Sequence, residues 1–137
     1  MSLVLDSSAT LAWIFLEERS AAITELFDKL ILGGGWVPLL WRLEVANVLE
    51  MRVRRGRIDA AFRDATLADL ELLPLQTDPD TEKHAWRTTL QLAERHRLTL
   101  YDAAYLELAV RRGLPLASLD RELRSAATAE NVVLLGA

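Results

Sequence analysis

Cysteine is absent from this chain of 137 residues. The absence excludes a disulfide framework, a zinc site built on thiolates and a cysteine nucleophile. It also fits a reducing compartment, so we expect a cytoplasmic protein. The longest apolar run near the N-terminus covers only residues 11–16, too few to span a bilayer, and the first residues lack the basic segment of a signal peptide. We therefore expect no association with membranes.

Positive charge is also scarce. The formal net charge is −4, and lysine occurs only at Lys29 and Lys83. A protein that binds nucleic acid through bulk positive charge is therefore not expected. An enzyme that grips phosphate groups through a bound metal ion is still allowed, because the ion brings its own charge.

Apolar residues are plentiful, at 51% of the chain. This content and the length predict one globular domain over residues 1–137. Short apolar segments alternate with longer amphipathic ones, which is typical of an α/β fold whose four to five strands form a mainly parallel sheet. The expected strands cover residues 3–5, 36–37, 72–76, 114–117 and 132–135. The expected helices cover residues 7–16, 20–30, 38–55, 59–70, 81–96, 100–112 and 121–129.

Two acidic residues follow expected strands. Asp6 comes directly after the first strand, and Asp120 comes shortly after the fourth. In a parallel sheet the carboxyl ends of the strands share one edge, and ligands bind there, near the point where the strand order reverses. Both carboxylates should therefore emerge at the ligand-binding edge. The alternative is that each simply caps the helix that follows it.

Two further acids lie in apolar helical surroundings. An ionised Glu44 within such a helix is costly unless it is paired or bound to metal, although Asn47 could share a narrow polar face with it. Asp102 follows Thr99 by three residues, which is close to a capping box. Tyr101 and Tyr105 leave little polar surface around Asp102, and this favours a functional role.

Four carboxylates at one sheet edge would repel one another, and a hard divalent ion relieves that repulsion. Mg²⁺ or Mn²⁺ suits oxygen ligands and can activate a water molecule against a phosphodiester. Ser7 and Ser118 lie close to two of the acids in the chain, and they could orient a carboxylate or only cap helices. Arg52 and Arg55 are candidates for contact with RNA, or are solvated residues at a helix end.

Several segments resemble one known family. Residues 98–109, LTLYDAAYLELA, and residues 114–120, LPLASLD, are similar to the signature segments of PIN-domain toxins of the VapC type. Residues 5–9 and 44–49 match the family in order and approximate spacing. The resemblance therefore covers nearly the whole chain, and the segment around Tyr101 is fairly specific.

The resemblance implies a three-layer α/β/α sandwich and a Mg²⁺- or Mn²⁺-dependent endoribonuclease that acts on RNA. It also implies a homodimeric toxin and a cognate antitoxin protein that blocks the site. The acids that it assigns to the metal site are Asp6, Glu44, Asp102 and Asp120. Two departures are visible: Arg97 stands where the family usually has glycine, and Ser118 replaces the commoner threonine. Neither departure removes a carboxylate.

Two other functions compete with a nuclease. A catalytically silent PIN-like module for protein interaction would be expected to have lost one or more acids, but all four are present. An aspartate-based phosphotransfer domain would need a lysine near the acids to bind phosphoryl oxygens. Neither Lys29 nor Lys83 follows a later strand, so this second alternative is weaker.

Overall fold

The computed structural model describes all residues from Met1 to Ala137. Its centre is one sheet of five parallel strands in the order β3-β2-β1-β4-β5. The strands are β1 (Leu3–Leu5), β2 (Gly35–Val37), β3 (Leu75–Thr77), β4 (Leu116–Ala117) and β5 (Leu134–Leu135). The chain builds the sheet outward from β1 in one direction and then in the other. The strand order therefore reverses between β1 and β4, and the expected parallel α/β sheet is confirmed.

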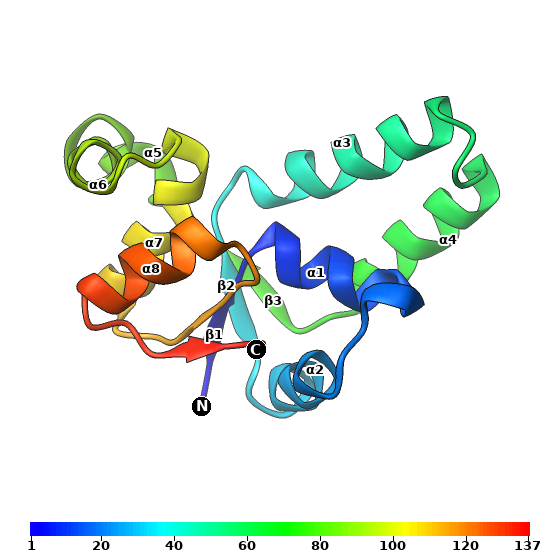
Figure 1. Ribbon diagram of the computed structural model, residues 1–137, viewed down its shortest axis with the longest axis horizontal. Coiled ribbons are helices and arrows are strands. Elements are labelled where there is room, and N and C mark those ends of the chain that lie inside the picture. The colour runs from blue at the N-terminus through cyan, green and yellow to red at the C-terminus, as the bar shows by residue number, and fades with distance from the viewer.

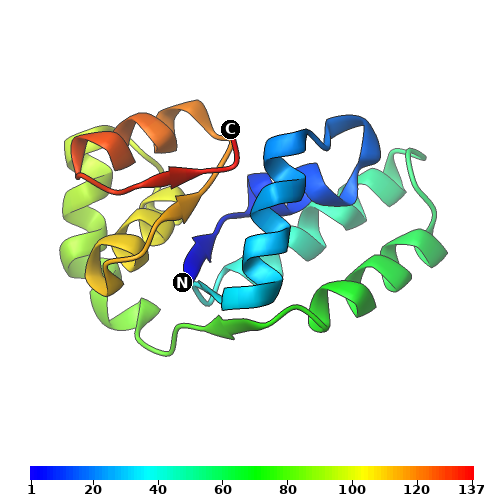
Figure 2. The ribbon, with the colours of Figure 1, turned by 90° about the horizontal axis from the view of Figure 1, so that it is seen from below.

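Helices cover both faces of this sheet (Figures 1 and 2). Those on one face are α1 (Ser7–Ile14), the short 3-10 helix η1 (Leu16–Glu18), α2 (Ala21–Gly33), α3 (Trp41–Arg54) and α4 (Ala60–Glu71). Those on the other are α5 (Thr81–His84), the π-helical segment η2 (Ala85–Thr89), α6 (Leu90–His96), α7 (Leu100–Arg112) and α8 (Arg121–Ala129). The expected three-layer sandwich is therefore confirmed. No helix is both long and apolar enough to cross a membrane.

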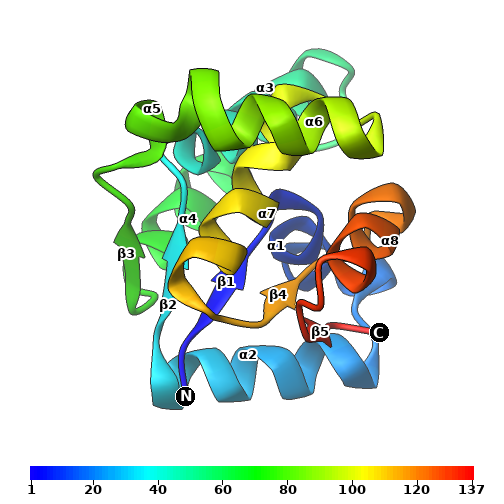
Figure 3. The ribbon, with the colours of Figure 1, turned by 90° about the vertical axis from the view of Figure 1, so that its left-hand side faces the viewer.

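The core lies where α7 packs on the central strands. Val4 and Leu5 of β1 are completely buried, and so are Leu106 and Leu108 of α7. Burial on both faces explains why β1 reads as a continuous apolar run rather than an alternating one. Figure 3 shows α7 lying across β1, with α5 and α6 above it and α2 below.

Several expected boundaries are wrong. The first helix ends at Ile14 rather than at residue 16, and the fourth and fifth strands begin at Leu116 and Leu134, two residues later than expected.

Three further differences each have a local reason. The helix expected from residue 38 begins at Trp41, because Pro38 instead opens a turn in which its carbonyl accepts from the Trp41 N–H at 3.1 Å. The third strand begins at Leu75, after Pro74, and it is the edge strand that a nearby proline favours. The helix expected over residues 81–96 is interrupted by η2, inside which Arg87 has non-helical φ and ψ angles of −120° and −107°.

A buried ionic cluster ties the end of β3 to α7. Asp78 is fully buried directly after β3 and accepts hydrogen bonds from Arg111 and Arg112. Arg111 also bonds to Glu107 at 2.7 Å, and Arg112 lies 3.5 Å over the ring of Trp36. Burial alone would raise the pKa of Asp78, but the bonds from the arginines hold it below its ordinary value. This carboxylate at the sheet edge is therefore a structural one.

Replacing Asp78 with alanine should strongly destabilise the fold. The change leaves two arginines partly buried without their shared counter-charge, and breaking such a pair typically costs about 3–5 kcal/mol. The free energy of unfolding in urea measures the loss. Asp69→Ala, at an exposed position of α4, is the matched control and should change it by less than about 0.5 kcal/mol. Equal unfolding midpoints for the two variants would contradict this structural role.

Candidate active site

Asp6 and Asp120 emerge beside each other in the strand order, at the point where that order reverses. Leu5 and Ala117 are register partners in β1 and β4, and the Asp6 N–H donates to the Ala117 carbonyl at 3.1 Å. Asp6 caps α1 through the Ala9 N–H, and Asp120 caps α8 through the Leu123 N–H, each at 2.9 Å. Both acids therefore do cap helices, at the edge where α/β sheets bind ligands.

Glu44 and Asp102 are carried to the same region by the first turns of two helices. Glu44 lies in the first turn of α3 and Asp102 in the first turn of α7. Thr99 caps α7 by accepting from the Asp102 N–H at 3.1 Å, so this part of the expected capping box is present. Capping of α7 uses the backbone N–H of Asp102, and the Asp102 carboxylate also interacts with the Thr99 side chain.

Tyr105 joins α7 to α3 by donating its hydroxyl hydrogen bond to the Glu44 carboxylate. Burial and the neighbouring Glu44 raise the pKa of this phenol far above its ordinary value, so it stays protonated and remains a donor. Sequence reasoning treated Tyr105 as part of an apolar surface. Its spacing of three residues from Asp102, on the same helical face, was the available signal.

Asp102 is the electrostatic centre of the acids. Burial is the largest cause of the raised pKa values of Asp6, Glu44 and Asp102, and it brings the pKa of Asp6 to about 6. The charge of Asp102 adds to the increase at Asp6 and at Glu44, and Asp120 does the same to Asp102. All four predicted acids therefore share one electrostatic neighbourhood. A fifth acid, Glu122, also acts on Asp102 and was not predicted.

A pair of serines links the loops that carry Asp6 and Asp120. Ser8 donates to the Asp6 carboxylate at 2.7 Å and accepts from the Leu119 N–H at 2.9 Å. Ser118 is fully buried, interacts with Asp6 and accepts from the Asp120 N–H at 3.0 Å. Ser7, the serine proposed for this position from sequence, lies instead near the Tyr105 hydroxyl. The role of Ser8 was not predicted, because Ser7 and Ser8 both lie close to Asp6 in the sequence and nothing in the sequence shows which hydroxyl reaches its carboxylate.

The predicted RNA-contacting arginines lie toward the other end of α3. Arg52 is eight residues beyond Glu44, or about 12 Å along the helix axis. Its guanidinium lies 3.8 Å over the ring of Phe15 and pairs with Glu18 at 3.7 Å. Arg55 follows the last turn of α3 and is exposed. The structure therefore does not bring either arginine to the acids, and contact with RNA stays a prediction for both.

The donor set suits a hard divalent ion that keeps part of its water shell. No three Asp, Glu or His side chains lie close enough together to surround one ion. Mg²⁺ needs few carboxylates, since it usually binds through one or two and retains several waters. Oxygen-only ligands select Mg²⁺ or Mn²⁺ over softer ions. Carboxylates whose pKa values are raised by burial and mutual repulsion therefore fit such an ion.

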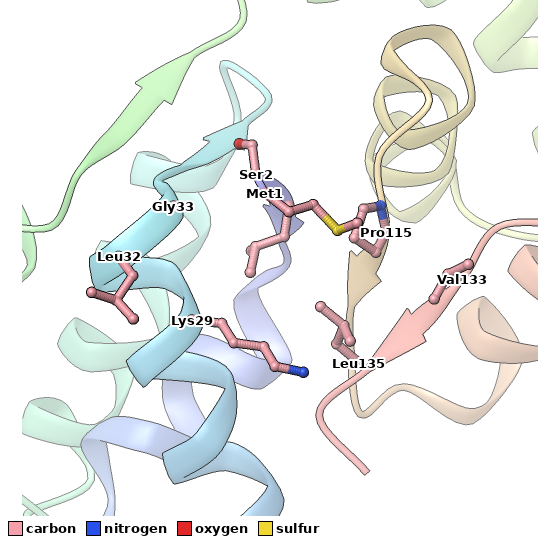
Figure 4. A pocket seen from close by; sticks show the side chains of 9 residues that line it. Met1, Ser2, Lys29, Leu32, Gly33, Pro115, Val133 and Leu135 are labelled. Carbon is pink, nitrogen blue, oxygen red and sulfur yellow. The ribbon is translucent and has the colours of Figure 1, made fainter.

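A separate pocket lies at the opposite edge of the sheet (Figure 4). Its volume is about 360 Å³, and its lining includes Met1, Leu32, Pro115 and Val133. Met1, Pro115 and Val133 precede the amino ends of β1, β4 and β5, and Leu32 lies near the end of α2, shortly before β2. No acid lines the pocket. This apolar pocket is therefore separate from the acidic site.

Replacing Asp6 with asparagine should make stability in chelator less dependent on pH. The pKa of Asp6 rises from 3.8 to about 6 in the folded protein. The folded state therefore holds a proton that the unfolded state releases, and the unmodified protein loses stability as the pH rises through this interval. The neutral amide avoids that loss, so the variant should be about 1–3 kcal/mol more stable above pH 7 and similar near pH 4.

Urea unfolding at several pH values in EDTA measures this effect. Asp69→Asn is the matched control, at an exposed position away from the sheet edge, and should follow the unmodified protein at every pH. An Asp6→Asn variant that is less stable than the unmodified protein by the same amount at every pH would show that Asp6 serves the fold alone.

Comparison with known proteins agrees with this arrangement. Residues 3–129 match the profile of the PIN domain. The chain is 34% identical over 131 residues to ribonuclease VapC3 of Pyrobaculum aerophilum, covering 90% of this chain and 92% of that protein. The crystal structure of PAE2754 from Pyrobaculum aerophilum is similar with a TM-score of 0.70 and 26% identity, covering 98% of this chain and 83% of that one. FitAcB from Neisseria gonorrhoeae shares the fold, with a TM-score of 0.66 and 14% identity, over 98% of this chain and 96% of that one. The chain belongs to the PIN-domain family.

Proposed function

We propose that residues 1–137 form a single PIN-like nuclease domain that acts as a metal-dependent endoribonuclease, the toxin of a VapBC-type toxin–antitoxin pair in the cytoplasm. The observation that carries the proposal is the convergence of acids at the reversal of strand order, with Asp102 acting on Asp6 and Glu44. Similarity to ribonuclease VapC3 supports the choice of RNA as substrate.

In this proposal Asp6, Glu44, Asp102 and Asp120 hold Mg²⁺ or Mn²⁺. The bound ion supplies an activated water and neutralises charge on the phosphoryl oxygens during hydrolysis of the phosphodiester bond. Ser8 and Ser118 hold the Asp6 carboxylate in one orientation. Tyr105 does the same for Glu44 from the next turn of α7. These hydrogen bonds orient the Asp6 and Glu44 carboxylates before an ion binds.

Removal of an acid should abolish cleavage while the fold is kept. Asp6→Asn and Asp102→Asn should each lower the rate of cleavage of a labelled RNA in Mg²⁺ by at least about a hundredfold, since each removes a carboxylate that binds the ion. EDTA should stop cleavage by the unmodified protein, and Mn²⁺ should restore it. Asp69→Asn on α4 is the matched control and should cleave normally. Unchanged cleavage in both Asp6→Asn and Asp102→Asn would show that these acids do not form the active site.

The two competing functions predict different results. A catalytically silent interaction module would show no metal-dependent cleavage of any RNA. A phosphotransfer domain needs a lysine near the acids, but Lys29 lies beside the apolar pocket at the opposite edge (Figure 4). Lys83 pairs with Asp80 at 3.5 Å in the turn before α5. The positions of both lysines therefore favour the nuclease.

We also propose that the toxin forms a homodimer when its cognate antitoxin is not bound. Exposed apolar side chains surround a groove of about 240 Å³ between the starts of α3, α5 and α7. Leu43 and Tyr101 line this groove, and Trp86, beside the lining residue Ala85, is 88% exposed. Monomers rarely leave such patches uncovered, and a two-fold dimer would cover the same patch on both copies.

Replacing Trp86 with serine should weaken the dimer at least about tenfold, because aromatic anchors dominate such interfaces. Light scattering after size-exclusion chromatography over a range of concentrations measures the change. Leu32→Ser is the matched control, since Leu32 is equally exposed at the opposite edge. A mass that stays monomeric for the unmodified protein, or a dimer that weakens only with Leu32→Ser, would contradict this interface.

A further inference from the structure

A polar pocket lies between the end of α6 and the first turns of α8. Its volume is about 400 Å³. The residues that line it are His96, Arg97, Arg121, Glu122, Ser125 and Ala126. Only the last of these is apolar, and the basic side chains outnumber the single carboxylate. The pocket is therefore a local concentration of positive charge on a chain whose net charge is −4.

The two arginines of this pocket are not used by the fold. Arg97 and Arg121 are exposed, and neither forms an ion pair within the chain. Their neighbours differ, because Arg95 and His96 both bind the carboxylate of Glu130, at 2.8 and 2.7 Å. Those two contacts fasten the end of α6 to the end of α8 and hold the walls of the pocket in place. The free guanidinium groups thus lie on a fixed frame.

Arg97 holds a backbone conformation that favours glycine. It ends α6 with φ 54° and ψ 42°, in the left-handed region. A side chain in this region brings its Cβ close to a backbone oxygen, whereas glycine adopts the conformation freely. Non-glycine residues in such conformations cluster at active sites and ligand-binding sites. An arginine here, with no partner in the fold, points to a ligand for its guanidinium group.

The pocket borders the acidic site. Arg121 directly follows Asp120, and the charge of Glu122 raises the pKa of Asp102 beyond the larger effect of burial. Arg97 lies two residues before Thr99, the cap of the helix whose first turn carries Asp102. An RNA strand bound across the acidic site can therefore continue into the neighbouring pocket.

We propose that Arg97 and Arg121 bind a backbone phosphate of the RNA, adjacent to the phosphodiester that is cleaved. Guanidinium groups bind phosphate oxygens through paired N–H donors, which fixes orientation as well as adding charge. Ser125 follows Arg121 by four residues, so its hydroxyl lies on the same face of α8 and adds a donor. Glu122 also lines the pocket and opposes binding, but the two arginines outnumber it. This inference rests on the proposed ribonuclease function.

The positive charge of the pocket offsets the repulsion between the acids and the RNA. A cluster of carboxylates repels the polyanion that it must cleave, and one or two divalent ions offset only part of that charge. A phosphate held beside the cluster keeps the scissile bond in place, so loss of the arginines should weaken RNA binding more than the chemical step. Arg97 and Arg121 are therefore positioning residues rather than catalytic ones.

Binding of a short fluorescent single-stranded RNA in Mg²⁺ tests the proposal, with Asp6→Asn as the parent so that the RNA stays intact. Adding Arg97→Gly or Arg121→Gln should weaken binding about tenfold, and each should lower the slope of log affinity against log salt by about 0.7. Because glycine suits the backbone at this position, Arg97→Gly should leave the melting temperature unchanged or higher. Arg97→Lys should restore part of the affinity. Lys29→Gln, at the opposite edge of the sheet, is the matched control for loss of one positive charge.

Each outcome decides a separate question. Losses of affinity no larger than that of Lys29→Gln, or a parent that binds no RNA, would overturn the phosphate site. If Arg97→Gly lowers the melting temperature, Arg121→Gln and Arg97→Lys decide instead. Loss of RNA affinity in both variants, together with no cleavage of RNA by the unmodified protein, would support the phosphate site and contradict the ribonuclease function. RNA cleavage by the unmodified protein, together with unchanged RNA affinity in both arginine variants, would support the ribonuclease function and contradict the phosphate site.

Discussion

Burial of neighbouring carboxylates around Asp102 is the constraint on which the site depends. Burial is the main reason that the ionised forms of Asp6, Glu44 and Asp102 are costly, and repulsion from the charge of Asp102 adds to that cost at Asp6 and Glu44. Hydrogen bonds from Ser8, Ser118 and Tyr105 hold Asp6 and Glu44, and helix caps hold Asp6 and Asp120. Under the proposed function a cation would offset the cost of the ionised forms, and affinity for the ion would then be coupled to the fold.

The parallel sheet makes this placement possible. Because the strand order reverses between β1 and β4, the segments that follow them diverge and leave room at one edge. A second carboxylate at a strand end, Asp78, has the opposite role. Arg111 and Arg112 neutralise it, and it fastens β3 to α7. Two carboxylates that each follow a strand thus differ in function because one has cationic partners and the other has only hydroxyl and amide donors.

The placement of Asp6 and Asp120 could be predicted from strand order, and Glu44 from its apolar surroundings. Asp102 depended mostly on the family resemblance, because its capping role is equally compatible with the sequence. The choice of Ser8 over Ser7 could not be predicted, since it depends on how α1 is rotated against the loop after β4. The break in the helix over residues 81–96 was also missed, because η2 carries no proline or glycine. The arginine at position 97, where the family usually has glycine, could be noticed in the sequence. Its pocket could not be predicted, because the neighbouring residues across it come from α8, far along the chain.

Proton release on metal binding tests the central claim most directly. Calorimetric titration with Mn²⁺ in buffers of different ionisation enthalpy gives the number of protons released. Since the pKa of Asp6 is about 6, an ion that binds its carboxylate must displace a proton near that pH. The account predicts net release near pH 6 that falls toward zero by pH 8 and is largely lost in Asp6→Asn. Binding of Mn²⁺ without proton release near pH 6, or with the same release in Asp6→Asn, would contradict it.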